Sequence, residues 1–139
     1  MIKIVDTDIE IDNCFSVIQQ LRANLARDAF VTYVRTQMDE GYKLAYMEVE
    51  SKVVCVAGFR IYHNLVAGKN LYVDDLVTSE AERSKGYGEE MISWLRELAR
   101  AQNCVVFHLD SGVQRHRAHK FYLNQGMDIV SYHFLQKLQ

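Results

Sequence analysis

The chain contains a run of six residues with the composition of an anion-binding turn, Arg83-Ser84-Lys85-Gly86-Tyr87-Gly88. The run separates a strand-like segment, residues 71–78, from a helix-like segment, residues 89–102. The first N–H groups of a helix lie unpaired at its positive dipole end, and two glycines let a diphosphate approach the backbone closely. Arg83 and Lys85 add positive charge at the rim. We therefore expect a diphosphate site here, although a glycine-containing turn before a helix is, taken alone, more often only a turn.

A second motif follows an apolar strand-like run at residues 104–109 and reads Ala118-His119-Lys120-Phe121-Tyr122-Leu123-Asn124-Gln125-Gly126-Met127. Together with the turn, it resembles the GNAT N-acetyltransferase superfamily. Members of that superfamily carry an Arg/Gln-x-x-Gly-x-Gly/Ala turn and, downstream, an Ala-x-x-Phe-Tyr-x-x-x-Gly-Phe segment. Both occur here in the expected order, separated by one helix and one strand. The resemblance is specific over residues 71–127 and only compatible over residues 1–70.

The resemblance implies acetyl-CoA as the cosubstrate, with its pyrophosphate on the turn and its pantetheine amides paired to strand backbone. The residues it assigns to acetyl-CoA are Leu76, Val77, Thr78, Arg83, Ser84, Lys85, Gly86, Tyr87, Gly88 and Arg115. Three of these depart from the pattern. Thr78 takes a place that is usually apolar. Ser84 replaces a glycine often found after the Arg, and Arg115 replaces an Asn that holds the cofactor in many members, so an arginine there would serve a phosphate instead.

The resemblance also implies that Tyr122 protonates the CoA sulfur as the thiolate leaves. A phenol with a pKa near 10 stays protonated at neutral pH and can give its proton to a thiolate. The alternative is that Tyr122 is a core aromatic residue whose hydroxyl is satisfied within the fold.

Acetyl transfer to an amine requires a neutral nitrogen, whereas an aliphatic amine is mostly protonated near pH 7. Asp74 and Asp75 lie on the strand that leads into the turn, and strand alternation predicts that their side chains point to opposite faces. We therefore expect one of them to face the acceptor. Counting back from Arg83 along the resemblance makes Asp74 the catalytic base, directly or through water, and a bulge would exchange the two roles. The alternative for either residue is solvation of a strand edge.

Composition and charge limit the class of protein. The 139 residues, 49% hydrophobic and 24% charged, suit one globular domain over residues 1–139. The formal net charge of −2 and the scattered basic residues give no attraction for nucleic acid. No segment approaches the roughly 18 apolar residues of a membrane span, and the first residues lack the apolar core of a signal peptide. We expect a cytoplasmic protein, and a homodimer is left open.

Cysteine and histidine patterns give no second chemistry. The three cysteines, Cys14, Cys55 and Cys104, lie in helix-like or strand-like segments and are expected to be free core thiols rather than nucleophiles. His116 and His119 have a spacing that could place two metal ligands on one helix face, but no Cys or acidic residue joins them locally. We therefore predict no metal site.

Hydrophobic spacing in the first part of the chain predicts a strand at residues 2–5 and two helices. Asp8 would cap the first helix, whose apolar positions are Ile11, Cys14, Phe15, Ile18, Leu21 and Leu25. The second would run from Asp28 to about Glu40 and stop at Gly41. We expect the segments 26–41 and 64–70 to roof the acceptor site, and neither has a recognised substrate signature.

The rest of the chain predicts an antiparallel meander followed by alternating helices and strands. The meander strands are expected at residues 42–48, 52–62 and 71–78, and then a helix at 89–102, a strand at 104–109, a helix at 115–124 and a last strand at 127–135. This order predicts an α/β (α+β) fold with a mixed, mostly antiparallel sheet flanked by helices, as in the GNAT fold.

The prediction for function is an acetyl-CoA-dependent N-acetyltransferase that acts by direct attack of a primary amine. A strand N–H near Leu76 or Val77 would polarise the thioester carbonyl. The acidic pair favours a cationic acceptor, such as a polyamine, an amino sugar, an aminoalkyl compound or a lysine side chain. The alternative is a non-catalytic acyl-CoA sensor or regulatory domain. A Rossmann-type nucleotide site is excluded because Met91 takes the third glycine position and the turn follows a meander.

Overall fold

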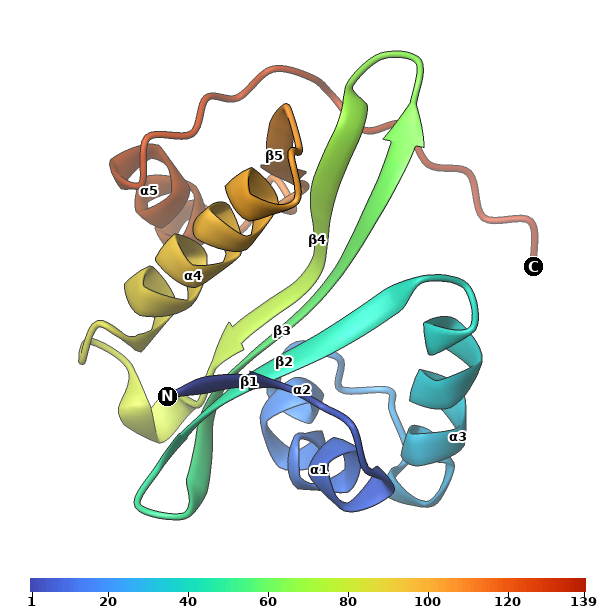
Figure 1. Cartoon of the computed structure of the whole chain (residues 1–139), viewed down its shortest axis with the longest axis vertical. Helices are drawn as coiled ribbons and strands as arrows, with labels where there is room; N and C mark the ends of the chain where they lie inside the picture. Colours follow the sequence, from blue (N-terminus) through green and yellow to red (C-terminus); the bar gives the residue numbers. More distant parts are fainter.

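The computed structural model describes residues 1–139 as five strands, five helices and one short 3-10 turn (Figure 1). The strands are β1 (Ile2–Ile4), β2 (Tyr42–Val49), β3 (Lys52–Asn64), β4 (Gly68–Thr78) and β5 (Val106–Leu109). The helices are α1 (Asp8–Asn13), α2 (Phe15–Leu21), α3 (Arg27–Met38), α4 (Tyr87–Ala101) and α5 (His116–Asn124), and the 3-10 turn η1 spans Glu80–Glu82.

The five strands form one sheet in the order β1-β2-β3-β4-β5. The pairs β1–β2, β2–β3 and β3–β4 are antiparallel, and β4–β5 is the one parallel pair. Parallel neighbours need a crossover connection, which α4 supplies between β4 and β5. The predicted mixed, mostly antiparallel sheet flanked by helices is therefore confirmed.

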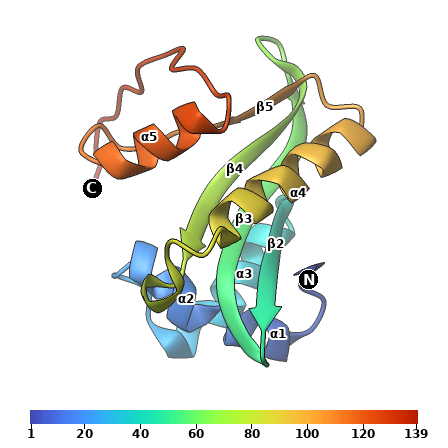
Figure 2. The ribbon, with the colours of Figure 1, turned by 90° about the vertical axis from the view of Figure 1, so that its left-hand side faces the viewer.

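Helices cover both faces of the sheet (Figures 1 and 2). Helices α1, α2 and α3 pack on one face, where Phe15, Ile18 and Phe30 join Leu44 and Val56 of the sheet in a buried cluster. Helix α4 packs on the other face through its apolar stripe of Met91, Leu95 and Ala99, which meets side chains such as Phe59 and Leu71. Because β4 alternates between these faces, it contributes to both clusters.

The predicted first helix is wrong in two details. It begins one residue after the N-cap Thr7, whose side chain accepts a hydrogen bond from the Glu10 N–H while the Glu10 carboxylate accepts one from the Thr7 N–H. Asp8 is therefore not the cap, because it already has helical geometry and the extended Thr7 reaches the third residue of the helix. The helix is also interrupted at Cys14, and α2 ends at Leu21, which leaves Leu25 in the loop before α3.

The predicted last strand at residues 127–135 does not form. This segment is rich in β-branched and aromatic residues, but a strand exists only where its backbone pairs with a neighbour. After Gly126, which has a φ of +85°, the chain leads away from α5 as an extended tail with no ladder partner (Figure 1). Strand propensity alone therefore does not decide the structure of this segment.

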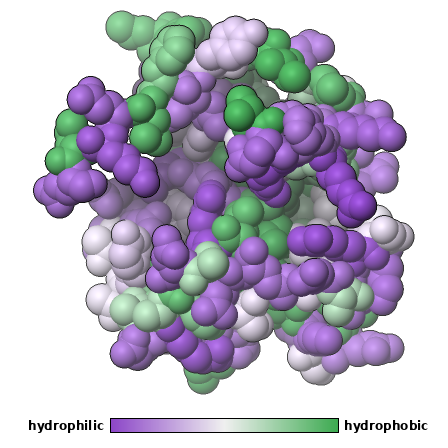
Figure 3. All heavy atoms as spheres, turned by 180° about the vertical axis from the view of Figure 1, so that it is seen from behind, coloured by the Kyte–Doolittle hydropathy of each residue, from purple (hydrophilic) through white to green (hydrophobic).

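The tail leaves several large apolar side chains exposed, among them Tyr132 and Phe134. Seen from behind, the surface is mostly hydrophilic, with hydrophobic side chains in separate groups (Figure 3). None of the helices combines the length and the apolar composition that crossing a membrane requires.

Candidate active site

A bulge in β4 sets the geometry of the acidic pair. Gly58 of β3 lies opposite Asp75, but the next residue, Phe59, lies opposite Val73, so Asp74 is an extra residue in β4. Val73 packs in the cluster on the α4 face, whereas Asp74 and Asp75 both line a pocket on the opposite face. The expectation that the two carboxylates point to opposite faces is therefore wrong, because the inserted residue breaks the two-residue alternation of the strand.

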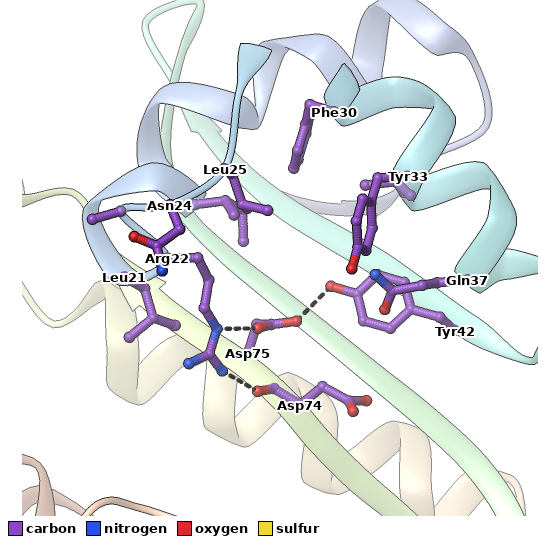
Figure 4. Close-up of a pocket in the computed structure, with 13 residues that line it drawn as sticks. Leu21, Arg22, Asn24, Leu25, Phe30, Tyr33, Gln37, Tyr42, Asp74 and Asp75 are labelled. Atoms are coloured by element: carbon purple, nitrogen blue, oxygen red, sulfur yellow. Dashed lines mark hydrogen bonds and ion pairs between the residues drawn. The ribbon is translucent and has the colours of Figure 1, made fainter. Parts of the chain in front are cut away.

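The pocket lies between β4 and the α2–α3 region and has a volume of about 580 Å³ (Figure 4). The sheet contributes Tyr42 and the two carboxylates to its lining, and the α2–α3 region contributes mostly apolar side chains together with Arg22, Asn24 and Gln37. The lining residues are Ile18, Leu21, Arg22, Ala23, Asn24, Leu25, Phe30, Tyr33, Val34, Gln37, Tyr42, Asp74 and Asp75. Of the two predicted roof segments, residues 26–41 contribute to the lining and residues 64–70 do not, because they form the far end of the β3–β4 hairpin.

Asp75 is held on both carboxylate oxygens. Arg22 Nε donates to Oδ1 at 2.9 Å, and the Tyr42 hydroxyl donates to Oδ2 at 2.7 Å (Figure 4). Tyr42 is buried, and burial together with the Asp75 charge raises the pKa of its phenol well above the ordinary value. Its ring fits against Gly58, since a Cβ at that position would lie 2.6 Å from Tyr42 Cε1. Asp75 therefore belongs to a fixed hydrogen-bonded group.

Asp74 is less restrained. Arg60 Nε donates to its Oδ2 at 3.2 Å, and no protein donor reaches Oδ1. Burial raises the pKa of the Asp74 carboxyl above its usual range, although the charge of Arg60 acts in the opposite direction. A carboxylate with a raised pKa and a free oxygen is suited to accept a proton.

The two neighbouring strands diverge next to this pocket. Strand β5 pairs with β4 only from Asn70–Val106 to Val73–Leu109, whereas β4 continues to Thr78. Leu76, Val77 and Thr78 therefore pair with β3 on one edge and have no strand partner on the other. Backbone groups on that free edge are available to a ligand.

The turn after β4 leads directly into α4. Gly86 is the N-cap of this 15-residue helix and has a φ of +85°, and no side chain caps the helix. The first N–H groups of a helix have no intrahelical partner, so this terminus presents donors at the positive end of the helix dipole. Arg83 and Lys85 are exposed beside it, and Lys85 Nζ also pairs with Glu82 at 2.6 Å. The turn for which we expect a diphosphate therefore leads into an uncapped helix N-terminus with two cationic side chains beside it.

Two residues of the turn, Ser84 and Gly88, have distinct structural constraints: a left-handed backbone at Ser84 and close packing at Gly88. Ser84 has a φ of +68°, the left-handed conformation in which a glycine is favoured. A Cβ at Gly88 would lie 3.4 Å from Thr78 Oγ1 and 3.5 Å from the Phe121 ring. Gly88 therefore lies where β4, α4 and α5 meet.

Helix α5 follows its N-cap residue Arg115 and carries Tyr122, whose phenol lies near the Arg115 guanidinium. Burial raises the pKa of the Tyr122 phenol, while the neighbouring Arg115 guanidinium opposes the increase. The Phe121 and Tyr122 rings lie edge to face at 5.4 Å between centroids. Tyr122 does not line the pocket of the two carboxylates, so the phenol and the acidic pair belong to different parts of the site.

The cysteines are free; Cys14 and Cys55 are buried as predicted, whereas Cys104 is only half-buried. Burial raises the pKa of the Cys14 thiol to about 12 and that of Cys55 to about 11, which disfavours the thiolate that a nucleophile needs. The His116 and His119 rings lie 6.0 Å apart, and no third His, Cys, Asp or Glu completes a group with them.

Sequence reasoning missed three residues of the pocket region, namely Arg22, Tyr42 and Arg60. They lie far from the acidic pair in the sequence, and Arg22 is 53 residues from Asp75. One signal was present. Gly58 interrupts an apolar strand run, and a glycine inside a strand often marks a close approach, which here is that of Tyr42.

The chain is similar to two N-acetyltransferases in sequence. It is 29% identical over 122 residues to the uncharacterised N-acetyltransferase YhdJ of Bacillus subtilis (strain 168), with 86% of each chain covered. It is 26% identical over 99 residues to the aminoalkylphosphonate N-acetyltransferase of Salmonella typhimurium (strain LT2). This alignment covers 70% of this chain and 62% of that protein.

Solved structures share the fold at low sequence identity. AAC(6')-Iy, solved in complex with the bisubstrate analogue CoA-S-monomethyl-acetylneamine, superposes with a TM-score of 0.84 at 11% identity, covering 100% of this chain and 99% of that one. Glucosamine-6-phosphate N-acetyltransferase from Arabidopsis thaliana gives a TM-score of 0.76 at 19% identity over the same shares. A sequence model of the acetyltransferase (GNAT) family matches residues 11–127, which include the β4 bulge, the turn and α5. The chain belongs to this family and is an acyltransferase of the N-acetyltransferase type.

Proposed function

We propose that this protein transfers the acetyl group of acetyl-CoA to a primary amine that binds in the pocket beside the acidic pair. The observation that supports this most directly is the β4 bulge. It directs Asp74 and Asp75 into one pocket just before the free strand edge at Leu76–Thr78 and the uncapped start of α4. The acidic pair, the free strand edge and the proposed diphosphate turn thus follow one another along β4 and the turn after it.

The residues named for acetyl-CoA fit the chemistry of that molecule. The α4 N-terminus and the exposed Arg83 and Lys85 suit a diphosphate, and the unpaired edge of β4 suits the amides of an extended pantetheine arm. The space beside Gly86 is open to such a ligand, because nothing lies within 4 Å of an added Cβ there. Acetyl-CoA supplies an acetyl group activated as a thioester.

Within the acidic pair we assign the base to Asp74 and a binding role to Asp75. Asp74 has a raised pKa and one oxygen without a donor, whereas both oxygens of Asp75 are occupied by Arg22 and Tyr42. Asp74 would take the proton that the amine nitrogen loses as the new N–C bond forms, directly or through water. This assignment agrees with the one reached by counting back from Arg83.

Tyr122 is the proposed proton donor to the sulfur as the C–S bond breaks. Burial raises the pKa of its phenol, so the hydroxyl remains protonated at neutral pH and can serve as an acid. Arg115 is the cation next to that phenol, and we propose that it also serves a phosphate of acetyl-CoA.

The relative from Salmonella typhimurium acts on aminoalkylphosphonates, which supports a small aminoalkyl compound as the acceptor class here. The function is tested by incubating the protein with acetyl-CoA and a panel of primary amines and detecting acetylated product by mass spectrometry. We expect turnover of at least one small amine. Binding of acetyl-CoA without turnover of any amine would instead favour the non-catalytic acyl-CoA sensor.

The same assay tests the role of Asp74 through its pH dependence. Because the base acts when deprotonated and its pKa is raised, the wild-type rate should fall as the pH decreases through a value above the ordinary carboxyl range. Asp74→Asn should lose this limb and lower kcat by about 100-fold or more, with acetyl-CoA affinity retained. Asp75→Asn is the matched control and should keep the limb. If the two variants exchange behaviour, Asp75 is the base.

A further inference from the structure

Arg22 is the one cation among the residues that line the acceptor pocket. It follows the last residue of α2, and its side chain reaches across to β4 (Figure 4). Its Nε donates to Asp75 Oδ1 and its Nη2 donates to the backbone carbonyl of Asp74, both at 2.9 Å. The Arg22 side chain is 49% exposed and that of Asp75 is 16% exposed, so the guanidinium covers the carboxylate from the solvent side.

The charges around the pocket balance. Asp75 is paired with Arg22, and Asp74 is paired with Arg60, which lies outside the lining. Two carboxylates against two guanidinium groups leave no net formal charge. An acceptor therefore meets no surplus negative charge that could hold a second ammonium group.

Most of the remaining lining is apolar. Leu21, Leu25, Phe30 and Val34 face the same space as the carboxylates, and eight of the 13 lining residues are hydrophobic. Such a surface gains free energy from burying a hydrocarbon chain and loses it when a charged group must be desolvated there. The pocket thus suits an amine whose body is apolar.

We propose that Arg22 determines acceptor selectivity: by neutralising Asp75, it makes the pocket select monoamines with an apolar body against diamines and polyamines. This inference rests on the proposed function, because it concerns the acceptor of the same reaction. It narrows the cationic acceptor classes expected from the acidic pair, since a polyamine would need the carboxylate that Arg22 occupies.

Hexylamine and 1,6-diaminohexane form a matched pair of acceptors, because they have the same length and differ by one ammonium group. The measured quantity is the ratio of kcat/KM for hexylamine to kcat/KM for the diamine, corrected for the two equivalent amines of the diamine. We expect wild type to favour hexylamine. In Arg22→Gln the ratio should fall by roughly five-fold or more, since one unpaired charge at about 4 Å contributes about 1 kcal/mol even when fully solvated.

Three further variants separate charge from packing. Arg22→Lys keeps the charge and should keep the wild-type ratio. Arg22→Gln combined with Asp75→Asn restores the neutrality of the pocket and should restore the wild-type ratio. Arg27→Ala removes a similarly exposed arginine whose partner, Asp12, lies outside the pocket, and it should leave the ratio unchanged.

The ratio distinguishes selectivity from a structural role of Arg22. If Arg22 only held the α2–α3 loop on the sheet, its loss would weaken both amines alike and the ratio would not move, which would overturn the inference. Calorimetric titration of both amines into the CoA-bound protein gives the same ratio from affinities if Arg22→Gln turns over too slowly. A wild type that acetylates no amine would refute the proposed function and this inference together, whereas an active wild type with an unchanged ratio in Arg22→Gln refutes the inference alone.

Discussion

Replacing Gly58 by alanine should push Tyr42 out of its place beside Asp75. Gly58 is buried on β3 opposite Asp75, and an added Cβ would lie 2.6 Å from Tyr42 Cε1 and closer still to Cζ and Oη. Real Cβ atoms essentially never come within 3.0 Å of a heavy atom outside their own residue and its chain neighbours, so the ring must move. Tyr42 is only 5% exposed and has little free space, and its movement would break the 2.7 Å hydrogen bond to Asp75.

The magnitude follows from these two losses. Overpacking a core costs about 1–3 kcal/mol, and losing a hydrogen bond to a charged group costs about 1.5–3 kcal/mol. Because one ring movement causes both, we expect Gly58→Ala to lower the free energy of unfolding by about 2–5 kcal/mol. For a chain of this length, that corresponds to a decrease in Tm of about 6–15 °C.

A double-mutant cycle tests the cause of this loss. Tyr42→Leu removes the three atoms that the new methyl group would meet. In that background, Gly58→Ala should be neutral or stabilising by up to about 1 kcal/mol, because alanine loses less conformational entropy on folding than glycine does. The free energy of unfolding is measured by urea titration for wild type, both single variants and the double variant. An equal cost of Gly58→Ala in both backgrounds would refute the close packing of Tyr42 on Gly58.

Two other changes address the turn and the proposed acid. Ser84→Gly should raise the free energy of unfolding by at most about 1 kcal/mol, with acetyl-CoA affinity retained. Glycine accepts the φ of +68° without strain, but it also loses more chain entropy on folding. A clear loss of stability in a urea titration would contradict this prediction. Tyr122→Phe should lower kcat at least ten-fold, with KM for acetyl-CoA and Tm nearly unchanged. An acyl donor with a more acidic thiol should recover part of the rate of this variant. A purely structural tyrosine would show no dependence on the leaving group.

The fold and the position of the turn before α4 could be predicted from the sequence because their signals are local. The strand, the turn with Gly86 and the apolar stripe of α4 follow from residue spacing over a few positions. The same holds for α3, which begins within one residue of the predicted start, and for β2 and β3 with their tight connection at Glu50 and Ser51. The segment 127–135 is where local signals failed, because a strand also needs a partner edge.

The sequence by itself determined which residue types could do the chemistry: two adjacent carboxylates, a turn with two glycines and a Phe-Tyr pair. Only the tertiary structure decided where the carboxylates point and what they contact. One extra residue in β4 turns both into the same pocket, and Arg22, Tyr42 and Arg60 then bind them in different ways. A register shift of one residue reverses the direction of a side chain, and no local pattern encodes the alignment of strands distant in sequence. The different surroundings of Asp74 and Asp75, on which the proposed division of roles rests, therefore depend on contacts between segments up to 53 residues apart.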